Sequence, residues 1–532
     1  SGLVIVSILM TGTRSALAAM WLQLLVLFPL AAWLYRDQFA FRGWDRARCG
    51  IAGGLLLVMV FGLGLVPSGN PKIHQEQRGG NALQRGFNRT ASISPSDPSL
   101  GVRTLMWKAT GRMIEARPLS GVGAGAWEND IPLYQEQGAQ LETDYYVHNE
   151  FLQLIAEYGL VGWLFLLLLF AYLVAAAFHT LRDRTPQGRA EGPDRALLLT
   201  SLLAFFIVSN VGFPWRMAAT GALFAACLAA LAASDARCGY RAGFGAKLLP
   251  WRPAYSRAGA VASVAALALA GYITQQAAES ERKIVRATQF ALTISASGDP
   301  GNPRWNGRKA ELLKLIREGI AINRHYRKIT PIVADELARW GDWRDATWIW
   351  ESVLSSRPYV VAIMTNVARG YASTGNPAKA LEYLERAKKI QPDAPAVRSL
   401  EVVLLSRTGQ EALALELARQ AMRTNIADYD LLNATFVLAG RAGDFPLARK
   451  AMELRMATTP ASRMQGYLQL GDMYLNAAHD PQQALQSFRQ AYALTPLSDR
   501  SALQQQIPPE LWSRLGPGTG TPTTPQTSVI SK

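Results

Sequence analysis

The chain has 532 residues and a formal net charge of +15, from 55 Lys and Arg against 40 Asp and Glu. This length exceeds what one hydrophobic core usually supports, so we expect two or more domains. Much of the basic excess is arginine in short segments between apolar runs, which is typical of the cytoplasmic loops of a membrane protein. The three cysteines show no paired spacing, which argues against a disulfide framework and a metal centre. We therefore predict no nucleic-acid partner, no metal and no cofactor.

Apolar runs are confined to the first 275 residues. A membrane-spanning helix needs roughly 20 mostly apolar residues, and six segments meet or approach that length. Residues 1–10 are expected to be the end of an earlier span. Because the chain opens on Ser1 without an initiator Met or a signal-peptide pattern, we expect that an upstream portion is missing. The predicted spans are residues 15–35, 50–67, 151–178, 196–212, 215–234 and 258–275.

Lys and Arg residues indicate the orientation of these spans. They are concentrated in residues 36–48, 181–195 and 235–257, which are alternate loops if the six spans are correct. Since cytoplasmic loops carry an excess of Lys and Arg, all three are predicted to be cytoplasmic. The periplasm of a bacterial inner-membrane protein would then receive residues 68–150, the short turn at residues 213–216 and everything after residue 276.

The long outer loop, residues 68–150, is too long for a plain connector. Its early half is basic and its later half is acidic. Such a loop could hold an anionic group at one end and activate a nucleophile at the other, although a solvated loop of mixed charge is the simpler interpretation. The charged residues are Lys72, Arg78, Arg85, Arg89 and Arg103, then Glu128, Asp130, Glu136, Glu142 and Asp144.

The C-terminal part contains an internal repeat. Ala346, Ala380, Ala414 and Ala448 follow one another at intervals of 34 residues, the tetratricopeptide period. Small alanines let paired helices approach closely, and a proline twelve residues after three of them ends the second helix. A last unit is displaced by two residues. About five units over residues 325–500 are predicted, preceded by a linking or capping helix within 281–324.

These patterns together predict an all-α protein with three parts. Residues 1–280 form a polytopic membrane helix bundle, residues 281–514 a periplasmic tetratricopeptide solenoid, and residues 515–532 a disordered tail rich in Gly, Pro and Thr. Concave solenoid surfaces usually bind proteins, so a protein partner for the repeats is expected. Bracing of the membrane domain is the alternative.

Three short stretches of the membrane part carry the chemistry. The first is Thr13-Arg14-Ser15-Ala16 at a span end. The second runs from Arg103 through Trp107 and Arg117 to the glycine-rich segment 121–125, which we interpret as a tight turn. The third is His148-Asn149, followed after nine residues by Gly159 and Gly162, which are expected to permit close helix packing.

With these motifs the chain resembles the O-antigen ligase superfamily, which includes O-antigen polymerases and bacterial O-oligosaccharyltransferases. The third stretch matches that family's His-Asn and Gly-x-x-Gly pattern without a gap. The first resembles its Ser/Thr-Arg-Gly segment, with Ala16 in place of the usual glycine. The resemblance covers about residues 1–235. It implies a GT-C-like, metal-independent enzyme that uses a glycan on undecaprenyl diphosphate as donor.

The resemblance also implies residue roles. Arg14 and Arg103 match the family's functional arginines, and an arginine fork suits a diphosphate leaving group. A neutral histidine suits deprotonation of the acceptor hydroxyl, so His148 is the predicted base. The simpler alternatives are an interfacial histidine, a snorkelling Arg14 and an ordinary loop charge at Arg103. Predicted substrate-binding residues are Arg117, Arg216, Asn149 and Trp107.

Two classes of function stay open at this point. The first is a glycosyltransferase whose acceptor is lipid A core, a growing glycan chain or a protein hydroxyl. The second is a non-catalytic, membrane-anchored tetratricopeptide scaffold for polysaccharide assembly or export. A transporter is disfavoured because the spans contain few ionisable residues.

Overall fold

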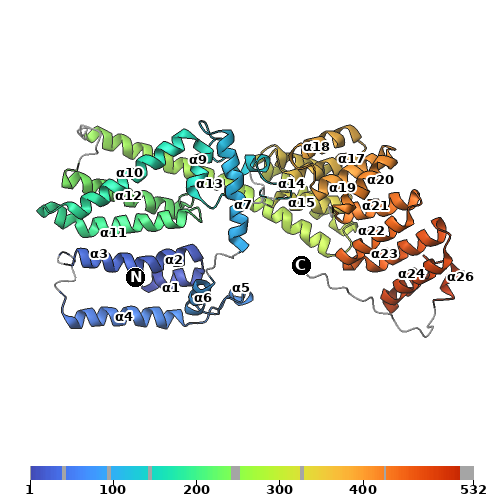
Figure 1. Ribbon diagram of the computed structural model, residues 1–532, viewed down its shortest axis with the longest axis horizontal. Coiled ribbons are helices and arrows are strands. Elements are labelled where there is room, and N and C mark those ends of the chain that lie inside the picture. The colour runs from blue at the N-terminus through green and yellow to red at the C-terminus, as the bar shows by residue number, and fades with distance from the viewer. Residues whose placement is uncertain are drawn as a thin grey trace. The chain divides into compact units, whose positions relative to one another are not determined.

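The computed structural model describes residues 2–36, 38, 44–92, 98–139, 141, 146–240, 252–323, 329–424 and 427–515. Within these ranges the chain is helical and contains no β-strand, only an isolated bridge between Pro67 and Asn81. The all-α prediction is confirmed. The chain divides into two compact units, Ser1–Ala268 and Leu269–Lys532, and each is described by itself (Figure 1). Apart from Leu515, the predicted disordered tail lies outside the described residues.

The first unit consists of long apolar helices and several short ones. Six helices, some of them composite, are long and apolar enough to cross a membrane, which confirms the predicted number. The helices are α1 (Gly2–Thr11), α2 (Arg14–Leu22), η1 (Gln23–Leu27), α3 (Phe28–Leu34), α4 (Arg46–Gly64), α5 (Pro71–Gln75), α6 (Ala82–Ala91), α7 (Pro98–Ala116), α8 (Trp127–Asp130), η3 (Ile131–Leu133), α9 (Glu150–Tyr158), α10 (Leu160–Arg182), α11 (Pro186–Ser209) and α12 (Ala218–Cys238). The last helix, α13 (Pro253–Ala296), begins in the first unit and continues into the second.

Three span boundaries differ from the prediction. The predicted span 151–178 is divided at Gly159, whose φ of 56° and ψ of −128° end α9 before α10 begins. The predicted span 196–212 lies within α11, which already begins at Pro186. The predicted span 258–275 lies within α13, which continues to Ala296 as one helix of 44 residues. At 1.5 Å per residue α13 is about 66 Å long, about twice the apolar thickness of a bilayer.

Arg195 has a different environment from the one predicted. The sequence predicts that it belongs to the cytoplasmic loop 181–195, but it lies inside α11 and is fully buried. Its guanidinium pairs with Asp235 of α12 at 2.6 Å and donates to Thr180 of α10 at 2.8 Å. A buried charge needs such partners, and Arg195 therefore ties three helices together instead of marking a loop.

One end of the first unit collects the segments with family motifs. There α1 ends, α2 begins, and α6 lies beside both (Figure 1). The short helix α9 packs against α7 and leads into α10, while the turn between α11 and α12 returns to the same place through hydrogen bonds with Glu150. We call this region the motif end.

The second unit is a solenoid of helical hairpins. After α14 (Asn306–Ile322) come five pairs: α15 (Thr330–Arg339) with α16 (Trp343–Leu354), α17 (Val361–Ser373) with α18 (Pro377–Ile390), α19 (Pro395–Arg407) with α20 (Glu411–Arg423), α21 (Tyr429–Arg441) with α22 (Phe445–Thr458), and α23 (Arg463–Asp472) with its extension η7 (Met473–Ala477) and α24 (Pro481–Leu494). The short α25 (Arg500–Gln504) and α26 (Pro509–Trp512) follow. The predicted solenoid of two-helix units is thereby confirmed. The four alanines of the repeat are fully buried.

A second periodic feature of the repeats escaped the sequence analysis. Gly341, Gly375, Gly409 and Gly443 have φ between 75° and 86° and end the first helix of four hairpins. Glycine adopts this conformation without steric cost. In the fifth hairpin, His479 takes the corresponding place with a φ of 52°, after the π-helix η7. The two-residue displacement of the last unit occurs in the segment that contains this π-helix.

Candidate functional site

The motif end begins with the junction of α1 and α2, which α6 covers. Arg85 of α6 is buried and donates to the carbonyl of Met10 at 3.0 Å, and Arg89 donates to the carbonyl of Gly12 at 2.9 Å. Arginines near a helix C-terminus satisfy its last carbonyl groups in this way. Arg14 starts α2 immediately after this junction, and its Nε donates to Ser92 at 3.2 Å.

These arginines lie close enough to repel one another. Burial and the positive charge of Arg14 both lower the pKa of the Arg103 guanidinium, so the two predicted leaving-group residues are near each other. The pKa of Arg89 is also lowered, first by burial and then by Arg14 and two further arginines, Arg78 and Arg85. Glu76, at 2.8 Å from Arg85, is a carboxylate within the cluster. We call Arg14, Arg85, Arg89 and Arg103 the arginine cluster.

His148 stands in a loop whose backbone is fixed on both sides. The residue before it, Val147, is fully buried; its carbonyl accepts from Trp107 Nε1 at 3.1 Å, and its N–H donates to Gln153 at 3.2 Å. After it, Asn149 caps α9 by accepting from the backbone N–H groups of Phe151 and Leu152. His148 itself has a φ of 55°, which is uncommon for a residue with a side chain.

Trp107 connects this loop to the arginine cluster. It lies on α7, one helical turn after Arg103, so both side chains share one face of that helix. The half-buried imidazole of His148 meets the edge of the Phe213 ring, with centroids 5.1 Å apart. Phe213 also contacts Tyr146. Two segments, α7 and the turn after α11, therefore hold the histidine loop.

The nine residues between His148-Asn149 and Gly159 are the helix α9. Gly159 ends this helix with its positive φ. Only glycine fits there, because a Cβ would lie 2.4 Å from the Leu119 carbonyl oxygen. Gly162 lies almost as close to the Leu154 carbonyl, at 2.6 Å from a would-be Cβ, so both glycines allow close backbone packing, as predicted. The nine-residue spacing in the family motif therefore corresponds to the length of one short helix, from its N-cap Asn149 to its C-cap Gly159.

The glycine-rich segment 121–125 packs against the C-terminal end of α9, next to Gly159. Val122 and Gly123 donate their backbone N–H groups to the carbonyls of Ala156 and Glu157 at 2.9 and 3.0 Å. At Gly121 a Cβ would lie 2.4 Å from the Glu157 carbonyl oxygen. The predicted tight turn is therefore a backbone clamp on α9, and none of the described contacts gives it a phosphate-binding shape.

Arg216, a predicted substrate-binding residue, is engaged by two buried carboxylates. Its Nε lies 3.3 Å from Glu150 and its Nη2 lies 3.0 Å from Glu157. The side chains of these glutamates are 2% and 1% exposed. Burial raises the pKa of Glu150, while Arg216 and the backbone N–H of Trp215 oppose that shift. In the structure, Arg216 therefore binds the two buried carboxylates of α9.

Arg117 lies apart from the other candidates. It follows the C-terminal end of α7, fourteen residues or about 21 Å of helix beyond Arg103. Half of its side chain is exposed, and its nearest carboxylate is Asp130 at 4.0 Å. Burial raises the pKa of Asp130. The structure thus brings Arg14 and Arg103 together and links Arg103 to His148 through Trp107, but leaves Arg117 outside. Glu142 and Asp144 of the predicted acidic half lie outside the described residues.

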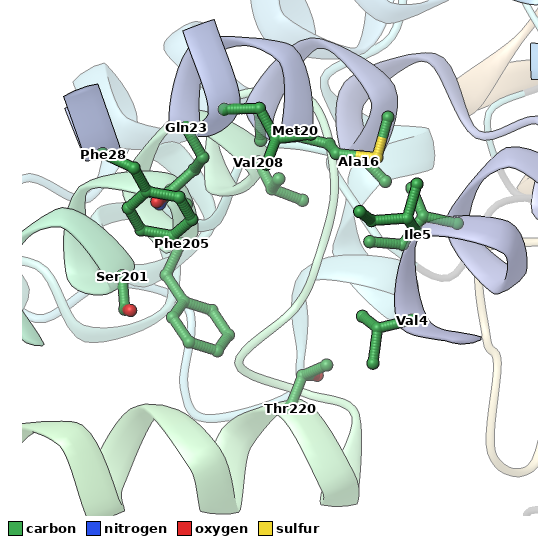
Figure 2. Close-up of a pocket in the computed structure, with 14 residues that line it drawn as sticks. Val4, Ile5, Ala16, Met20, Gln23, Phe28, Ser201, Phe205, Val208 and Thr220 are labelled. Carbon is green, nitrogen blue, oxygen red and sulfur yellow. The ribbon is translucent and has the colours of Figure 1, made fainter. Parts of the chain in front are cut away.

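An apolar pocket of about 610 Å³ lies between α1, the composite helix α2–η1–α3, α11 and α12. Ala16, Ala19, Met20 and Gln23 share one face of the helix that begins at Arg14, and all four line the pocket. Figure 2 shows Ala16, Met20 and Gln23 beside it. Across from them are side chains of α11 and, from α12, Thr220. Ala16, the departure from the family glycine, forms part of this wall.

Several residues of the motif end escaped the sequence analysis. Gln153, Glu150 and Glu157 looked like ordinary residues of a span, yet a run of three polar side chains at helical spacing within an apolar segment was a usable signal. The capping roles of Arg85 and Arg89 had no such signal, because they depend on α6 lying against α1. Within the described ranges no three His, Cys, Asp or Glu side chains gather as a metal site would require.

The comparison with protein families gives one match for the described motifs. The family model for O-antigen ligase, Wzy_C, matches residues 1–167. This range contains all three motif stretches and ends within α10, short of the predicted residue 235. The match supports a glycan-transferring function in general terms. No curated protein shows a significant sequence match to this chain.

Solved structures resemble the helical hairpins. Pseudomonas aeruginosa pilF is 14% identical, with 43% of this chain and 99% of that chain covered and a TM-score of 0.30. A tetratricopeptide repeat protein from Parabacteroides merdae is 15% identical, with 44% and 98% covered and a TM-score of 0.31. Similarity at this level supports no conclusion about function. From its own helices and the family match, the chain is a multi-pass membrane protein whose first 167 residues match the O-antigen ligase family and whose C-terminal unit is a tetratricopeptide-type solenoid.

Proposed function

We propose that the motif end transfers a glycan from a polyprenyl-diphosphate donor, undecaprenyl diphosphate in bacteria, to an acceptor hydroxyl at the periplasmic face of the inner membrane. The observation that carries this proposal is the position of the arginine cluster. Arg14 lies two residues before Ala16, which lines the apolar pocket, and Arg103 is linked through α7 to the His148 loop. A lipid diphosphate, an arginine site and a base form the minimal set for this reaction.

The arginine cluster supports a diphosphate ligand. Burial and the neighbouring positive charges lower the pKa of the Arg89 guanidinium, and like charges held together in this way cost free energy until an anion compensates them. The Nη1 of buried Arg85 has no hydrogen-bond partner among the described residues. Arg14 and Arg103 would bind the phosphate oxygens directly, and Arg89 would add a third positive charge. Their charge would stabilise the leaving diphosphate as it develops negative charge.

The apolar pocket supports a polyprenyl chain as the other half of the donor. Arg14 contacts Ser92 on the other side of α2 from the pocket, but it starts the helix only two residues before Ala16, which lines the pocket. A lipid whose phosphates meet Arg14 would pass the N-terminal end of α2 and continue along Ala16, Ala19 and Met20. The lining of the pocket is mostly apolar, and Gln23, Ser201 and Thr220 contribute the few polar groups. A volume of about 610 Å³ would take several isoprene units.

In the transfer step, His148 would act as general base. The acceptor oxygen attacks the anomeric carbon while its proton passes to the imidazole, and the bond between that carbon and the phosphate oxygen breaks. The electron pair leaves with the polyprenyl diphosphate, which is a weak base and needs no general acid. One displacement of this kind inverts the anomeric configuration.

The solenoid supports a protein partner or a protein acceptor. A cavity of about 460 Å³ lies between α17, α19 and α21, and Arg369 and Asp430 form an ion pair of 2.8 Å beside it. A lipid A core or a growing glycan chain would be recognised at the membrane unit instead. We propose that the repeats recruit a protein.

Replacement of His148 by Ala tests the reaction. The full-length protein and its variants would be expressed in a strain that lacks the gene, followed by analysis of lipopolysaccharide, secreted polysaccharide and glycoproteins. Loss of one glycan class with accumulation of the lipid-linked donor is expected, and the lost class identifies the acceptor. Lys108→Ala, an exposed residue of the same helix as Trp107, is the matched control.

Retained transfer by His148→Ala protein at normal abundance would contradict the proposed base. If Arg14→Ala and Arg103→Ala also transfer normally, the enzyme proposal fails. If the variants of the membrane unit restore all glycans and only the repeat unit is needed for their production, the scaffold function is indicated instead.

A further inference from the structure

The polar face of α9 provides contacts whose purpose the proposed reaction does not explain. Glu150, Gln153 and Glu157 are three and four residues apart, so they share one side of the helix. All three are at most 2% exposed. Burying three polar side chains at the membrane surface costs free energy unless each is fully hydrogen-bonded.

A chain of contacts joins Arg216 to the His148 loop, and its hydrogen bonds converge on Glu157 as the final acceptor. Arg216 Nη2 donates to Glu157 at 3.0 Å, Gln153 Nε2 donates to the other oxygen of Glu157 at 2.9 Å, and Val147 N–H donates to Gln153 Oε1 at 3.2 Å. A carboxylate only accepts hydrogen bonds. Glu157 therefore fixes which end of the Gln153 amide faces Val147.

This amide orientation matters because the loop is strained. A φ of 55° at His148 costs about 1 kcal/mol or more for a residue with a Cβ and persists only when its surroundings impose it. The Gln153 contact and the Trp107 contact together hold both backbone groups of Val147. The imidazole then has one backbone position from which it can reach an acceptor.

Arg216 fixes the far end of the same chain of contacts. Its Nε contacts Glu150, whose other oxygen accepts from the backbone N–H of Trp215 at 2.9 Å. Arginine suits this bridging because its planar fork presents donors in two directions. The turn that carries Phe213 is thus fastened to α9, and Phe213 closes against His148.

We propose that Arg216, Glu157 and Gln153 are positioning residues that set the backbone orientation of His148, and that Arg216 is not a ligand of the substrate. This inference rests on the proposed function, because it assumes that His148 is the base. It predicts that turnover depends on which groups donate and which accept hydrogen bonds along this chain of contacts, and not on the presence of any one charge.

An exchange of the two helix residues tests the inference. Glu157→Gln allows Gln153 to turn its amide, which places two donors opposite each other at Val147. In the double variant Gln153→Glu/Glu157→Gln, the carboxylate now at position 153 accepts from Val147 and from the amide introduced at position 157. The oxygen of that introduced amide accepts from Arg216. Every donor again meets an acceptor, with the charge unchanged.

Turnover would be measured on purified full-length protein, with lipid-linked glycan extracted from the deletion strain as donor. We expect Glu157→Gln to lower kcat at least tenfold with KM for the donor changed less than threefold, and the double variant to recover to within threefold of the parent. Glu115→Gln, an exposed glutamate on α7, should have no effect. Trp107→Phe, which keeps an aromatic ring but loses the indole N–H contact and part of the ring's packing, should lower kcat as well.

The outcomes separate the two levels of the proposal. An active Glu157→Gln protein beside an inactive His148→Ala protein would overturn the positioning inference alone. An active His148→Ala protein would overturn both. If Glu157→Gln fails to accumulate, the double variant and Trp107→Phe decide: loss of donor affinity with unchanged kcat in either would contradict the inference.

Discussion

The two units of this protein differ in how far along the chain their contacts reach. In the solenoid, each helix packs mainly on the next one or two helices, and small residues recur at a fixed interval. At the motif end, the contacts around the His148 loop join residues 40 to 66 positions apart. Local, repeated contacts leave a period in the sequence, whereas a site assembled from distant segments leaves isolated polar residues. The same comparison predicts that the motif end tolerates substitution less well than the repeats.

The largest expected difference concerns arginine charges. Arg14→Ala or Arg103→Ala should lower glycan transfer by about 100-fold or more, because each would remove a group that stabilises the leaving diphosphate. Arg441 of the solenoid is an exposed arginine paired with Glu411 at 3.0 Å, and Arg441→Ala should change the free energy of unfolding by less than about 1 kcal/mol. Transfer in membranes and resistance of the full chain to proteolysis measure the two effects. If Arg441→Ala lowered transfer as much as Arg14→Ala or Arg103→Ala, the proposed difference between the two units would be contradicted.

Glycines with positive φ give the second comparison. Gly159→Ala adds a Cβ only 2.4 Å from a backbone carbonyl, so the full-length protein should accumulate to a small fraction of its normal level. Gly409 has a φ of 81° but no atom near a would-be Cβ, so Gly409→Ala should cost only about 1–2 kcal/mol. Membrane abundance and thermal unfolding of the purified chain would show this. Normal abundance of the Gly159 variant would mean that α9 can end in another way.

Packing alanines test the solenoid itself. Ala414 is fully buried between paired helices, and Ala414→Leu should destabilise the repeat by about 1–3 kcal/mol through overpacking. Glycan transfer to a small soluble acceptor should stay intact if the repeats only recruit a partner. Loss of that transfer would show that the membrane unit depends on the repeats for more than recruitment.

The smallest expected effect is a stabilisation. Asp428 caps α21 by accepting from Leu431, and burial raises its pKa. Because the folded pKa lies above the unfolded value, the folded state binds more protons between the two values, and stability falls as pH rises through that window. Asp428→Asn keeps the cap and removes the charge, so it should raise the free energy of unfolding at neutral pH by less than about 1 kcal/mol. Unfolding at several pH values would test this, and a destabilised variant would contradict it.

The sequence was sufficient for features that repeat or that follow from length and apolarity. The number of spans and the helical hairpins were predicted from such patterns, and the family motifs indicated where chemistry should be sought. The sequence could not reveal that Arg195 pairs with Asp235, or that Arg216 contacts Glu157, because each partner lies far away along the chain. The division of the predicted span at Gly159 also depends on a distant contact, with the carbonyl of Leu119.

The fixed length of α9 has a consequence for comparison with other sequences. Asn149 begins the helix, Gly159 ends it, and one added residue would rotate its two ends by about 100° relative to each other. Glu150, Gln153 and Glu157 would then no longer meet Arg216 and the His148 loop together. The spacing between the two halves of the motif therefore has to be nine residues. A related chain with eight or ten residues there should lack this arrangement, even when its histidine and both glycines are present.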